Sequence, residues 1–403
     1  MAEAAMKTET YAMAAPETAR AAQGHARFRR LTLTDFRSYA RADIALDGRP
    51  VALIGANGAG KTNILEAVSL FGPGRGLRSA RLDELPRVEG RGGWAVSARL
   101  ETAGDERHLG VGAGADEPGR RVCRVDEASA SGPGAFCDHV RFMWLTPAQD
   151  RLFMEGAGER RRFLDRIALA LNPAQARASA DYDLAMRQRQ RLLDERSRDD
   201  AWLTALETQM AEAGVALAAA RREAAGALVA AEIDGEAGFP AAEIALEGAL
   251  EAALGSAPAA DVEEEFLAAL RAKRHIDAAA GRALTGPHRS DLIVTHRQKG
   301  RPARLCSTGE QKALLIGLVL AAARSLALQG RFRGGAPAPL VLLLDEIAAH
   351  LDEDRRAALF DILDGLGFQV FMTGTDKSLF SAWGSRAQAF AVEGGSLNET
   401  TVR

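Results

Sequence analysis

The chain has 403 residues, of which 47% are hydrophobic and 26% are charged, and its formal net charge at pH 7 is -3. Such a length allows two or three domains with sizeable cores in a soluble globular protein. The three cysteines show no paired spacing and no apolar run reaches transmembrane length, which argues against a secreted disulfide scaffold and a membrane-spanning protein. We therefore expect a cytoplasmic protein without a membrane partner, and the balanced charge leaves binding to nucleic acid open.

Residues 1–27 are rich in alanine and lack the compact apolar core of a signal peptide. We expect this segment to be a disordered tail. The segment LTLTDFRSYA, Leu31 to Ala40, follows it and precedes the first motif.

An apolar strand, Val51 to Ile54, leads into a loop that fits the pattern G-x-x-x-x-G-K-[ST], and a helix follows. The loop consists of Gly55, Ala56, Asn57, Gly58, Ala59, Gly60, Lys61 and Thr62. Its glycines let backbone N–H groups surround a phosphate, and the helix N-terminus adds partial positive charge. In such loops the lysine reaches the β- and γ-phosphates and the threonine hydroxyl binds Mg²⁺. The motif predicts ATP and Mg²⁺ as ligands; the alternative is a glycine-rich turn that matches by chance.

The segment GPGRGLRSARLDEL, Gly72 to Leu85, follows the helix of this loop, and we expect it at the nucleotide edge of the domain. The alternating runs WAVSARLE, RHLGVGAG and RRVCRVDE predict an antiparallel β subdomain. HVRFMWL then predicts a buried strand that leads to Gln149.

The middle of the chain, residues 156–285, has a helical pattern. Asn172 as N-cap and Pro173 at the first helical position begin one helix, and Asp200 caps the next. The second helix carries an apolar stripe of Trp202, Leu206, Met210 and Leu217. The two helices predict an antiparallel hairpin. A further helix is expected from Asp261 to Asp277, before GPHRSDL returns the chain to the first domain.

The stretch CSTGEQKALL, Cys306 to Leu315, opens an apolar helix. A serine hydroxyl and free N–H groups at a helix N-terminus form an anion site, although Ser307 or Thr308 as an ordinary N-cap is the alternative. The apolar run Leu340 to Leu344 predicts a buried parallel strand. It ends in Asp345 and Glu346. Beside a phosphate loop, Asp345 is placed to hold Mg²⁺ and Glu346 to polarise the attacking water, unless the strand simply ends in two acids.

A strand that ends in Asp-Glu, the AAHLD that follows it and the serine-bearing helix start together resemble the ABC-type ATPases. The signature loop of that class is close to L-S-G-G-Q; Ser307 and Gly309 match it, whereas Thr308 and Glu310 depart from it. The resemblance implies that this loop faces the γ-phosphate held by a second subunit. It also implies that Gln149 contacts Mg²⁺ and the attacking water, with a plain loop residue as the alternative.

Thr62 and Cys306 are 244 positions apart in the chain, which is typical of the chromosome-maintenance branch rather than of transporter subunits. The segments LTLTDFRSYA, GPGRGLRSARLDEL, LTPAQDRLFMEGAGERRRFLDR and GPHRSDL, in this order, are similar to the RecF family of bacterial DNA replication and repair ATPases. We expect an α/β fold: an ABC-type ATPase head with an antiparallel β subdomain, interrupted by an inserted helical domain. The expected units are the tail (1–27), an N-terminal lobe (28–155), the helical domain (156–285) and a C-terminal lobe (286–403).

The resemblance implies an ATP-dependent, DNA-binding homodimer that acts at single-strand gaps or junctions in recombinational repair and replication, and that is needed for the SOS response. It further implies the partners RecO and RecR and a slow DNA-dependent ATPase that works as a switch. Two other functions stay open. A transporter-type ATPase subunit is disfavoured by the long insertion, and a metabolic P-loop kinase would have no use for CSTGEQK and AAHLD.

The candidates for DNA contact are arginines in basic segments, with solvated basic faces as the alternative. They are Arg75, Arg78, Arg160, Arg161 and Arg162, with Arg166 nearby and Arg187, Arg189 and Arg191 on the hairpin. An arginine such as Arg78 is expected to couple a DNA phosphate to the nucleotide. No zinc, helix-turn-helix or aromatic RNA-binding pattern is visible, so we expect recognition of the DNA backbone or of a junction rather than of bases.

Overall fold

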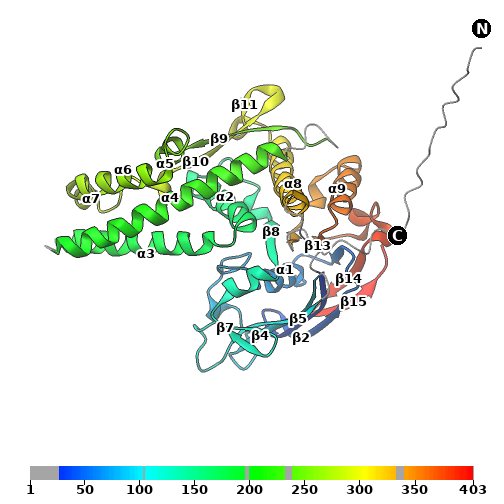
Figure 1. The fold of residues 1–403 in the computed structure, drawn as a ribbon. Coiled ribbons are helices and arrows are strands. Elements are labelled where there is room, and N and C mark those ends of the chain that lie inside the picture. The colour runs from blue at the N-terminus through cyan, green and yellow to red at the C-terminus, as the bar shows by residue number, and fades with distance from the viewer. Residues whose placement is uncertain (1–26, 103–104, 196–198, 232–237, 333–339, 403) are drawn as a thin grey trace, which may run out of the picture.

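The computed structural model describes residues 27–102, 105–195, 199–231, 238–332 and 340–402. The tail predicted at residues 1–27 lies outside the described residues, apart from Arg27 at the start of the first strand. The described strands form two six-stranded sheets and one three-stranded sheet. In Figure 1 the two larger sheets lie together, and a group of long helices extends away from them.

The central sheet has the strand order β15-β14-β3-β13-β12-β8. Its strands are β3 (Val51–Ile54), β8 (Arg141–Leu145), β12 (Leu340–Leu344), β13 (Gln369–Gly374), β14 (Gln388–Glu393) and β15 (Ser396–Thr400). Neighbouring strands are parallel except for the antiparallel pair β14 and β15. All five residues of β12 are buried, as expected for a parallel strand covered on both faces. The two strands predicted to carry nucleotide-site residues are thus separated by β13 alone.

The second large sheet is antiparallel, with the order β2-β1-β4-β5-β6-β7. Its strands are β1 (Arg27–Phe36), β2 (Tyr39–Ala45), β4 (Trp94–Glu101), β5 (Glu106–Ala113), β6 (Val122–Val125) and β7 (Ala128–Ala130). Buried and exposed residues alternate strictly along β4, so one face of the sheet packs on the core. That core also takes residues of α1 (Lys61–Ser69). The predicted antiparallel β subdomain is confirmed.

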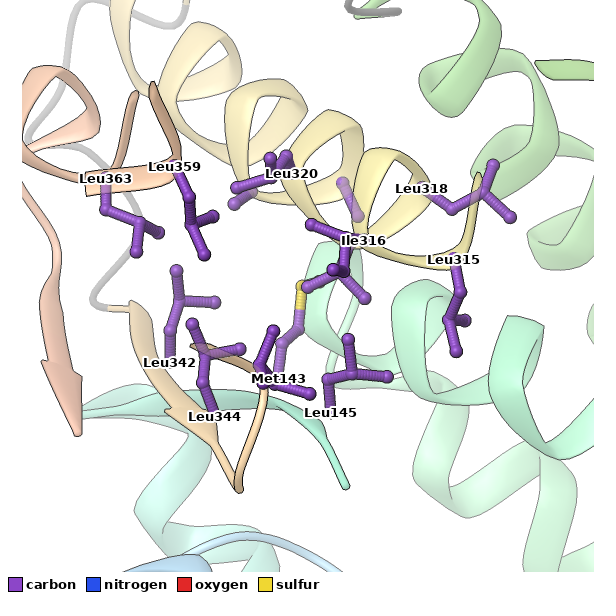
Figure 2. Close-up of a cluster of buried hydrophobic side chains, with 14 of the residues drawn as sticks. Met143, Leu145, Leu315, Ile316, Leu318, Leu320, Leu342, Leu344, Leu359 and Leu363 are labelled. Atoms are coloured by element: carbon purple, nitrogen blue, oxygen red, sulfur yellow. The ribbon is translucent and has the colours of Figure 1, made fainter. Parts of the chain in front are cut away.

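Two helices, α8 (Thr308–Phe332) and α9 (Glu353–Leu366), share a core with the central sheet. Figure 2 shows side chains of α8, such as Ile316 and Leu320, facing side chains of β8, β12 and α9. Each fully buried residue of this size contributes about 1.5–3 kcal/mol to folding. Among the described helices, the stretch Thr308–Leu328 is long and apolar enough to cross a membrane, but 78% of its apolar window is buried. Its apolarity is explained by its place in the core.

The helical arm, residues 175–280, extends from this head (Figure 1). It contains α3 (Gln175–Asp194), α4 (Asp200–Ala230), α5 (Ala249–Ala253), α6 (Ala259–Ala272) and α7 (Arg274–Ala280), and α2 (Ala157–Leu171) leads into it. The middle of the chain is not wholly helical as predicted. β9 (Ala242–Glu247) pairs with β10 (Asp291–His296), and β10 also pairs with β11 (Arg301–Pro302). The predicted boundary at residue 285 therefore falls between two strands of one sheet.

The predicted start of the hairpin is wrong by a few residues. Asn172 is the C-cap of α2, and its side-chain oxygen accepts a hydrogen bond from the backbone N–H of Ala174. This local turn takes Asn172 and Pro173 out of the following helix, which begins at Gln175.

The second hairpin helix differs from its prediction in two ways. Asp199, not Asp200, caps α4 by accepting a hydrogen bond of 2.9 Å from the N–H of Trp202. Trp202 is 52% exposed and so does not join the buried stripe of Leu206, Met210 and Leu217. The helix predicted from Asp261 to Asp277 is also divided, into α6 and α7.

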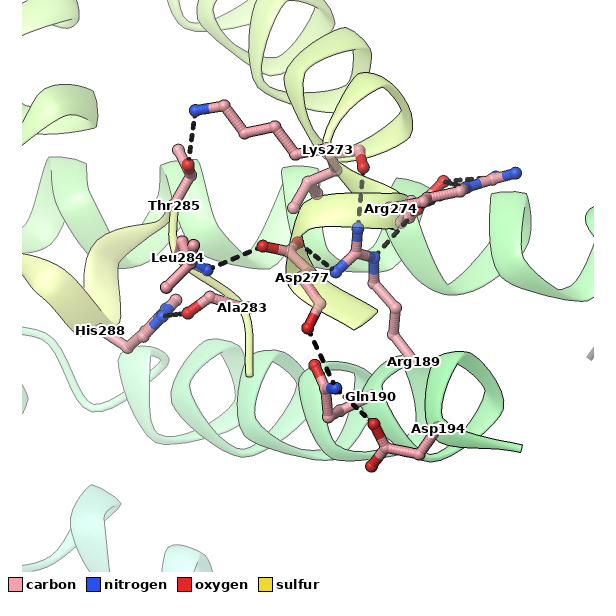
Figure 3. A network of polar contacts seen from close by, with 12 residues as sticks. Arg189, Gln190, Asp194, Lys273, Arg274, Asp277, Ala283, Leu284, Thr285 and His288 are labelled. Carbon is pink, nitrogen blue, oxygen red and sulfur yellow. Dashed lines mark hydrogen bonds and ion pairs between the residues drawn. The ribbon is translucent and has the colours of Figure 1, made fainter. Parts of the chain in front are cut away.

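A buried network of charges holds the arm together, as Figure 3 shows. The guanidinium of Arg189 on α3 donates to Glu207 of α4 at 2.9 Å, to Asp277 of α7 at 2.7 Å and to the carbonyl of Leu270 on α6 at 2.7 Å. Arg189 is 1% exposed. Arg189 is therefore a structural residue, and the expectation that it contacts DNA is wrong.

Candidate functional site

The phosphate loop lies between β3 and α1, at the carboxyl ends of the parallel strands. Gly58 and Gly60 have φ angles of 81° and 110°, which side-chain-bearing residues rarely adopt. The hydroxyl of Tyr39 donates to the carbonyl of Gly60 at 3.0 Å, and a Cβ at Gly60 would lie 2.7 Å from that hydroxyl oxygen. The segment LTLTDFRSYA thus supports the loop from behind, a role that the sequence reasoning did not assign.

The side chain of Lys61 is folded into the loop. Its ammonium group donates to the carbonyls of Gly55 at 2.7 Å and Ala56 at 2.9 Å. Burial lowers the pKa of Lys61, while the nearby carboxylates of Glu346 and Asp345 act in the opposite direction. A phosphate oxygen is a stronger acceptor than these carbonyls, so the same ammonium group is placed to bind one.

Side-chain oxygen atoms of Thr62 on α1, Asp345 just after β12 and Thr373 on β13 lie together. We call this group the catalytic corner. The hydroxyl of Thr62 donates to the carboxylate of Asp345 at 2.9 Å, and the hydroxyl of Thr373 donates to the same carboxylate at 2.7 Å. The backbone N–H of Glu346 donates to Thr373 at 2.8 Å. Sequence reasoning missed Thr373, whose signal would have been its place at the end of a buried strand.

The corner fits Mg²⁺ through a hydroxyl and one buried carboxylate. Among the described residues, no group of three or more His, Cys, Asp or Glu side chains is placed to hold a metal ion. Mg²⁺ needs no such group, because it is commonly held by one or two carboxylates together with waters and substrate phosphates. Thr62 and Asp345 are therefore the residues that would hold it.

The two candidates for catalysis, Glu346 and Gln149, line the same pocket as Thr62 and Asp345. This pocket has a volume of about 710 Å³. Glu346 has a φ of 55°, a strained value for a residue with a side chain, of the kind found at functional sites. Gln149 lies at the end of a short turn, Pro147–Gln149, and its side-chain oxygen accepts from the N–H of Thr146 at 3.2 Å. The structure brings Glu346 and Gln149 together, but the oxygen of Gln149 is engaged within its own loop.

The signature loop forms a capping box at the start of α8. The backbone N–H of Ser307 donates to the carboxylate of Glu310 at 2.9 Å, and the N–H of Glu310 points to the Ser307 hydroxyl at 3.5 Å. An ion pair with Lys299 and the hydrogen bonds to Ser307 lower the pKa of Glu310 to about 2. Ser307 and Gly309 are exposed, and the described residues that line the nucleotide-side pocket do not include them. In the single chain the loop is thus a helix cap, and it does not line the pocket of Thr62, Asp345 and Glu346.

The five DNA-contact candidates divide into two groups. Arg160 makes a double hydrogen bond with Asp291 at 2.8 and 2.7 Å, and Arg161 donates to the carbonyl of Ser290. These two arginines tie α2 to the GPHRSDL segment. Arg75, Arg78 and Arg162 are exposed. Arg162 pairs with Glu159 on its own helix, and Arg78 donates to Asn63 at 2.8 Å and to Glu66 at 3.3 Å.

Comparisons with known proteins agree with this geometry. A family model described as an AAA domain matches residues 30–87. Curated relatives that carry the name "DNA replication and repair protein RecF" include one from Rhizobium leguminosarum bv. trifolii (strain WSM2304), which is 51% identical over 92% of this chain and 98% of its own length. Another, from Mesorhizobium japonicum, is 53% identical over 92% of this chain and 97% of its own length.

Two solved structures show the likeness of fold. One, the "Structure of the recombination mediator protein RecF-ATPrS in RecFOR pathway", aligns with a TM-score of 0.78 at 22% identity, over 94% of this chain and 99% of that chain. An Smc head domain with an extended coiled coil, from Pyrococcus furiosus, aligns with a TM-score of 0.52 at 16% identity, over 93% of this chain and 96% of that chain. Both likenesses concern the fold of the ATPase head.

Proposed function

The chain belongs to the RecF family of DNA replication and repair proteins, and from that premise we propose that it is an ATP-driven switch that retains DNA as a homodimer. The observation that carries the proposal is the single pocket that gathers Thr62, Gln149, Asp345 and Glu346 from four separate segments. A nucleotide on the phosphate loop would place its terminal phosphate at this pocket.

The proposed binding roles follow from the contacts of each residue. The N–H groups of the loop and the ammonium group of Lys61 bind the β- and γ-phosphates, while Thr62 and Asp345 hold Mg²⁺. When bound, Mg²⁺ supplies positive charge against the phosphate oxygens. Thr373 fixes the carboxylate of Asp345, which keeps its second oxygen directed at Thr62. Each of these groups acts before and during hydrolysis without changing its place.

Hydrolysis itself falls to Glu346 and Gln149. The carboxylate of Glu346 accepts a proton from the attacking water, and the amide of Gln149 orients that water. Because the amide oxygen of Gln149 is held by Thr146 in the single chain, its release is a step that controls hydrolysis. This supports a slow ATPase that works as a switch.

Dimerisation is proposed from the place of Ser307 and Gly309. Both are exposed at the N-terminus of a 25-residue helix, where free N–H groups and the helix dipole attract an anion. Since they do not line the pocket beside their own phosphate loop, we assign to them the γ-phosphate held by a second copy of the chain. ATP held by one copy would then bind the signature loop of the other.

The partners and the setting are proposed from the family. They are gapped or junction DNA with a single-stranded part, the mediators RecO and RecR, and the recombinational repair and SOS pathways of the cytoplasm. We keep the units 28–155, 156–285 and 286–403 as functional units, in which the two lobes bind the nucleotide. The exposed arginines Arg75, Arg78 and Arg162 are the proposed DNA contacts on the head.

One experiment tests the proposal. The oligomeric state of the chain is measured by gel filtration with light scattering, with ATP, with ADP and without nucleotide, each with and without gapped duplex DNA. We expect a dimer with ATP alone, stabilised further by DNA, and a monomer of Lys61→Ala in every condition. A transporter-type subunit would show no effect of DNA, and a P-loop kinase need not form a dimer.

A further inference from the structure

The pocket beside the phosphate loop continues past the catalytic corner. Besides Thr62, Asp345 and Glu346 it is lined by Leu77, Arg78, Trp144, Phe163 and Arg166, which we call its far end; within that set, Arg78 also donates to Asn63, the neighbour of Thr62. The far end is built from the segment after α1, the edge strand β8 and one face of α2. Its volume of about 710 Å³ lies in the range of sites that hold a nucleotide-sized ligand, so a terminal phosphate and a metal ion leave much of it free.

Arg166 is the unusual residue of the far end. Its guanidinium lies over the ring of Trp144, 4.2 Å from the ring centre. Its Nη1 is buried and has no hydrogen-bond partner among the described residues. Burial lowers the pKa of Arg166 to about 10, which still leaves it charged at neutral pH. Arg166 as a whole is only partly buried, but a buried nitrogen without a hydrogen-bond partner is unfavourable for folding, so a ligand for it is expected.

The neighbouring charges do not serve as that ligand. Glu159, the nearest acid by its effect on Arg166, already forms an ion pair with Arg162 at the rim. Arg78, which lines the same pocket, also has no acid to itself. Its buried partner Glu66 is held by a double hydrogen bond from Arg37 at 2.7 and 2.8 Å, and Arg78 reaches it only at 3.3 Å. Arg166 and Arg78 therefore give the far end two positive charges without an acid of their own. Apart from Glu159, Asp345 and Glu346, the acid in the pocket lining is Glu155, which is exposed.

We propose that the far end of the pocket is a second phosphate-binding site, distinct from the backbone cradle of the phosphate loop, with Arg166 as its anchor and Arg78 as a second cation in the same lining. A phosphate group satisfies the free Nη1 of Arg166 by a charge-assisted hydrogen bond. The phosphate belongs either to a DNA strand or to the inorganic phosphate that hydrolysis releases next door. The apolar surfaces of Leu77, Trp144 and Phe163 suit the sugar or base that accompanies a strand phosphate. The inference rests on the proposed function only in taking the phosphate loop as the nucleotide site.

From its position, a phosphate bound at this site can influence ATP hydrolysis. It shares its pocket with Gln149 and Glu346, so a phosphate bound there changes the electrostatic field at the attacking water. The arginines of the family-specific segment ERRRFLDR then lie on two different faces of α2. Arg160 and Arg161 tie α2 to the chain around Ser290, while Arg162 and Arg166 face the pocket.

The test follows the fluorescence of Trp144 while the phosphate loop is kept filled with Mg–ADP. The chain is titrated at constant ionic strength with sodium phosphate, and separately with a short single-stranded oligonucleotide. In Arg166→Met the side chain keeps its length and its contact with the ring but loses its charge. The control is Arg177→Met, which removes an exposed arginine of the arm that pairs with Asp181 on its own helix. A Trp144→Phe variant identifies the source of the signal.

We expect a saturable change with phosphate that is about tenfold or more weaker in Arg166→Met, as the loss of one charge-assisted hydrogen bond implies, and unchanged in Arg177→Met. The melting temperature of Arg166→Met should be equal to or above that of the parent chain, since an unpaired buried charge is removed. Competition by the oligonucleotide assigns the site to a DNA strand, and its absence assigns the site to released phosphate.

Equal titration curves for Arg166→Met and the parent chain would overturn the proposal, and so would a signal that survives in Trp144→Phe. A drop in melting temperature with unchanged phosphate binding would show that Arg166 only packs against Trp144. Affinity for ADP is measured first in every variant. Failure to bind ADP would contradict the proposed function, whereas the difference between Arg166→Met and Arg177→Met would still report on the second site.

Discussion

The ammonium group of Lys312 lies 2.9 Å from the carboxylate of Asp150, and both side chains are largely buried. Lys312 is one turn into α8, the helix that begins beside Ser307, and Asp150 directly follows Gln149. This ion pair is therefore a direct link between the helix that follows Ser307 and the loop of Gln149, the proposed catalytic glutamine. A movement of α8 on contact with a partner's nucleotide would pull on the Gln149 loop.

Lys312→Met is expected to break this link and slow ATP hydrolysis by about 10- to 100-fold, as when a group that orients a metal ligand is lost. The affinity for ATP should not change, because neither residue contacts the phosphate loop. Removing one partner also leaves Asp150 unpaired, which costs roughly 1–3 kcal/mol of stability. The double variant Lys312→Met with Asp150→Asn should regain that stability without regaining hydrolysis. Recovery of hydrolysis together with stability would mean that the pair has a structural role only.

The arm gives a prediction about stability. Arg189→Met leaves Glu207 and Asp277 buried without their shared cation, so we expect the free energy of unfolding to fall by about 3–5 kcal/mol. Arg191→Met, two residues away but exposed and paired with Glu195, should change it by less than about 1 kcal/mol. Urea denaturation followed by circular dichroism measures both. A DNA-binding defect in Arg189→Met without any loss of stability would restore the original expectation for this residue.

Glu346→Gln should keep ATP binding and slow hydrolysis by about 10²- to 10⁴-fold, since an amide cannot accept the proton of the attacking water. The ATP-bound dimer should then persist for longer than in the parent chain. Single-turnover hydrolysis and light scattering on the same sample check both effects. Turnover equal to that of the parent chain would assign the activation of water to another residue.

Arg78→Ala should lower the stimulation of ATPase activity by DNA more than it lowers the basal rate. Arg78 is exposed, and Glu66 keeps its double hydrogen bond to Arg37 when Arg78 is removed, so the helix of the phosphate loop should stay in place. Arg81→Ala is the matched control, because Arg81 is exposed in the same segment and pairs with Asp83. Rates with and without gapped DNA give the comparison. An equal fall of the basal and the stimulated rate would point to a structural role for Arg78.

The head could be predicted from the sequence because its signals are local. The apolar run of β12 and the glycine pattern after β3 each lie within a few residues, and their adjacency in one sheet follows from the fold that such runs form. Contacts between distant residues leave no such signal. Thr373 on Asp345 and Lys312 on Asp150 depend on which strand and helix become neighbours. The four arginines from Arg160 to Arg166 look alike in sequence, and only the packing of α2 decides which of them face the pocket.

The last prediction concerns Ser307, whose hydroxyl completes a helix cap in the single chain. Ser307→Arg should leave the affinity of the monomer for ATP unchanged, because Ser307 does not line the pocket of Thr62, Asp345 and Glu346. In a dimer the arginine stands where the partner's γ-phosphate docks, so ATP-driven dimerisation, hydrolysis and DNA retention should all fall. Ser307→Ala is the control: it loses the same cap, at a cost of about 1 kcal/mol, without adding bulk.

Mixing two inactive variants separates action within one chain from action between chains. In a mixed dimer of Ser307→Arg and Lys61→Ala, one composite site carries both lesions and the other carries neither. Hydrolysis should therefore reappear on mixing, provided that one ATP holds the dimer together, and it should rise with the fraction of mixed dimers. Full hydrolysis by Ser307→Arg alone would show that the loop at Ser307 is only the helix cap seen in the single chain. The dimeric switch would then have to be abandoned, because no other exposed helix start in the described residues carries the signature pattern.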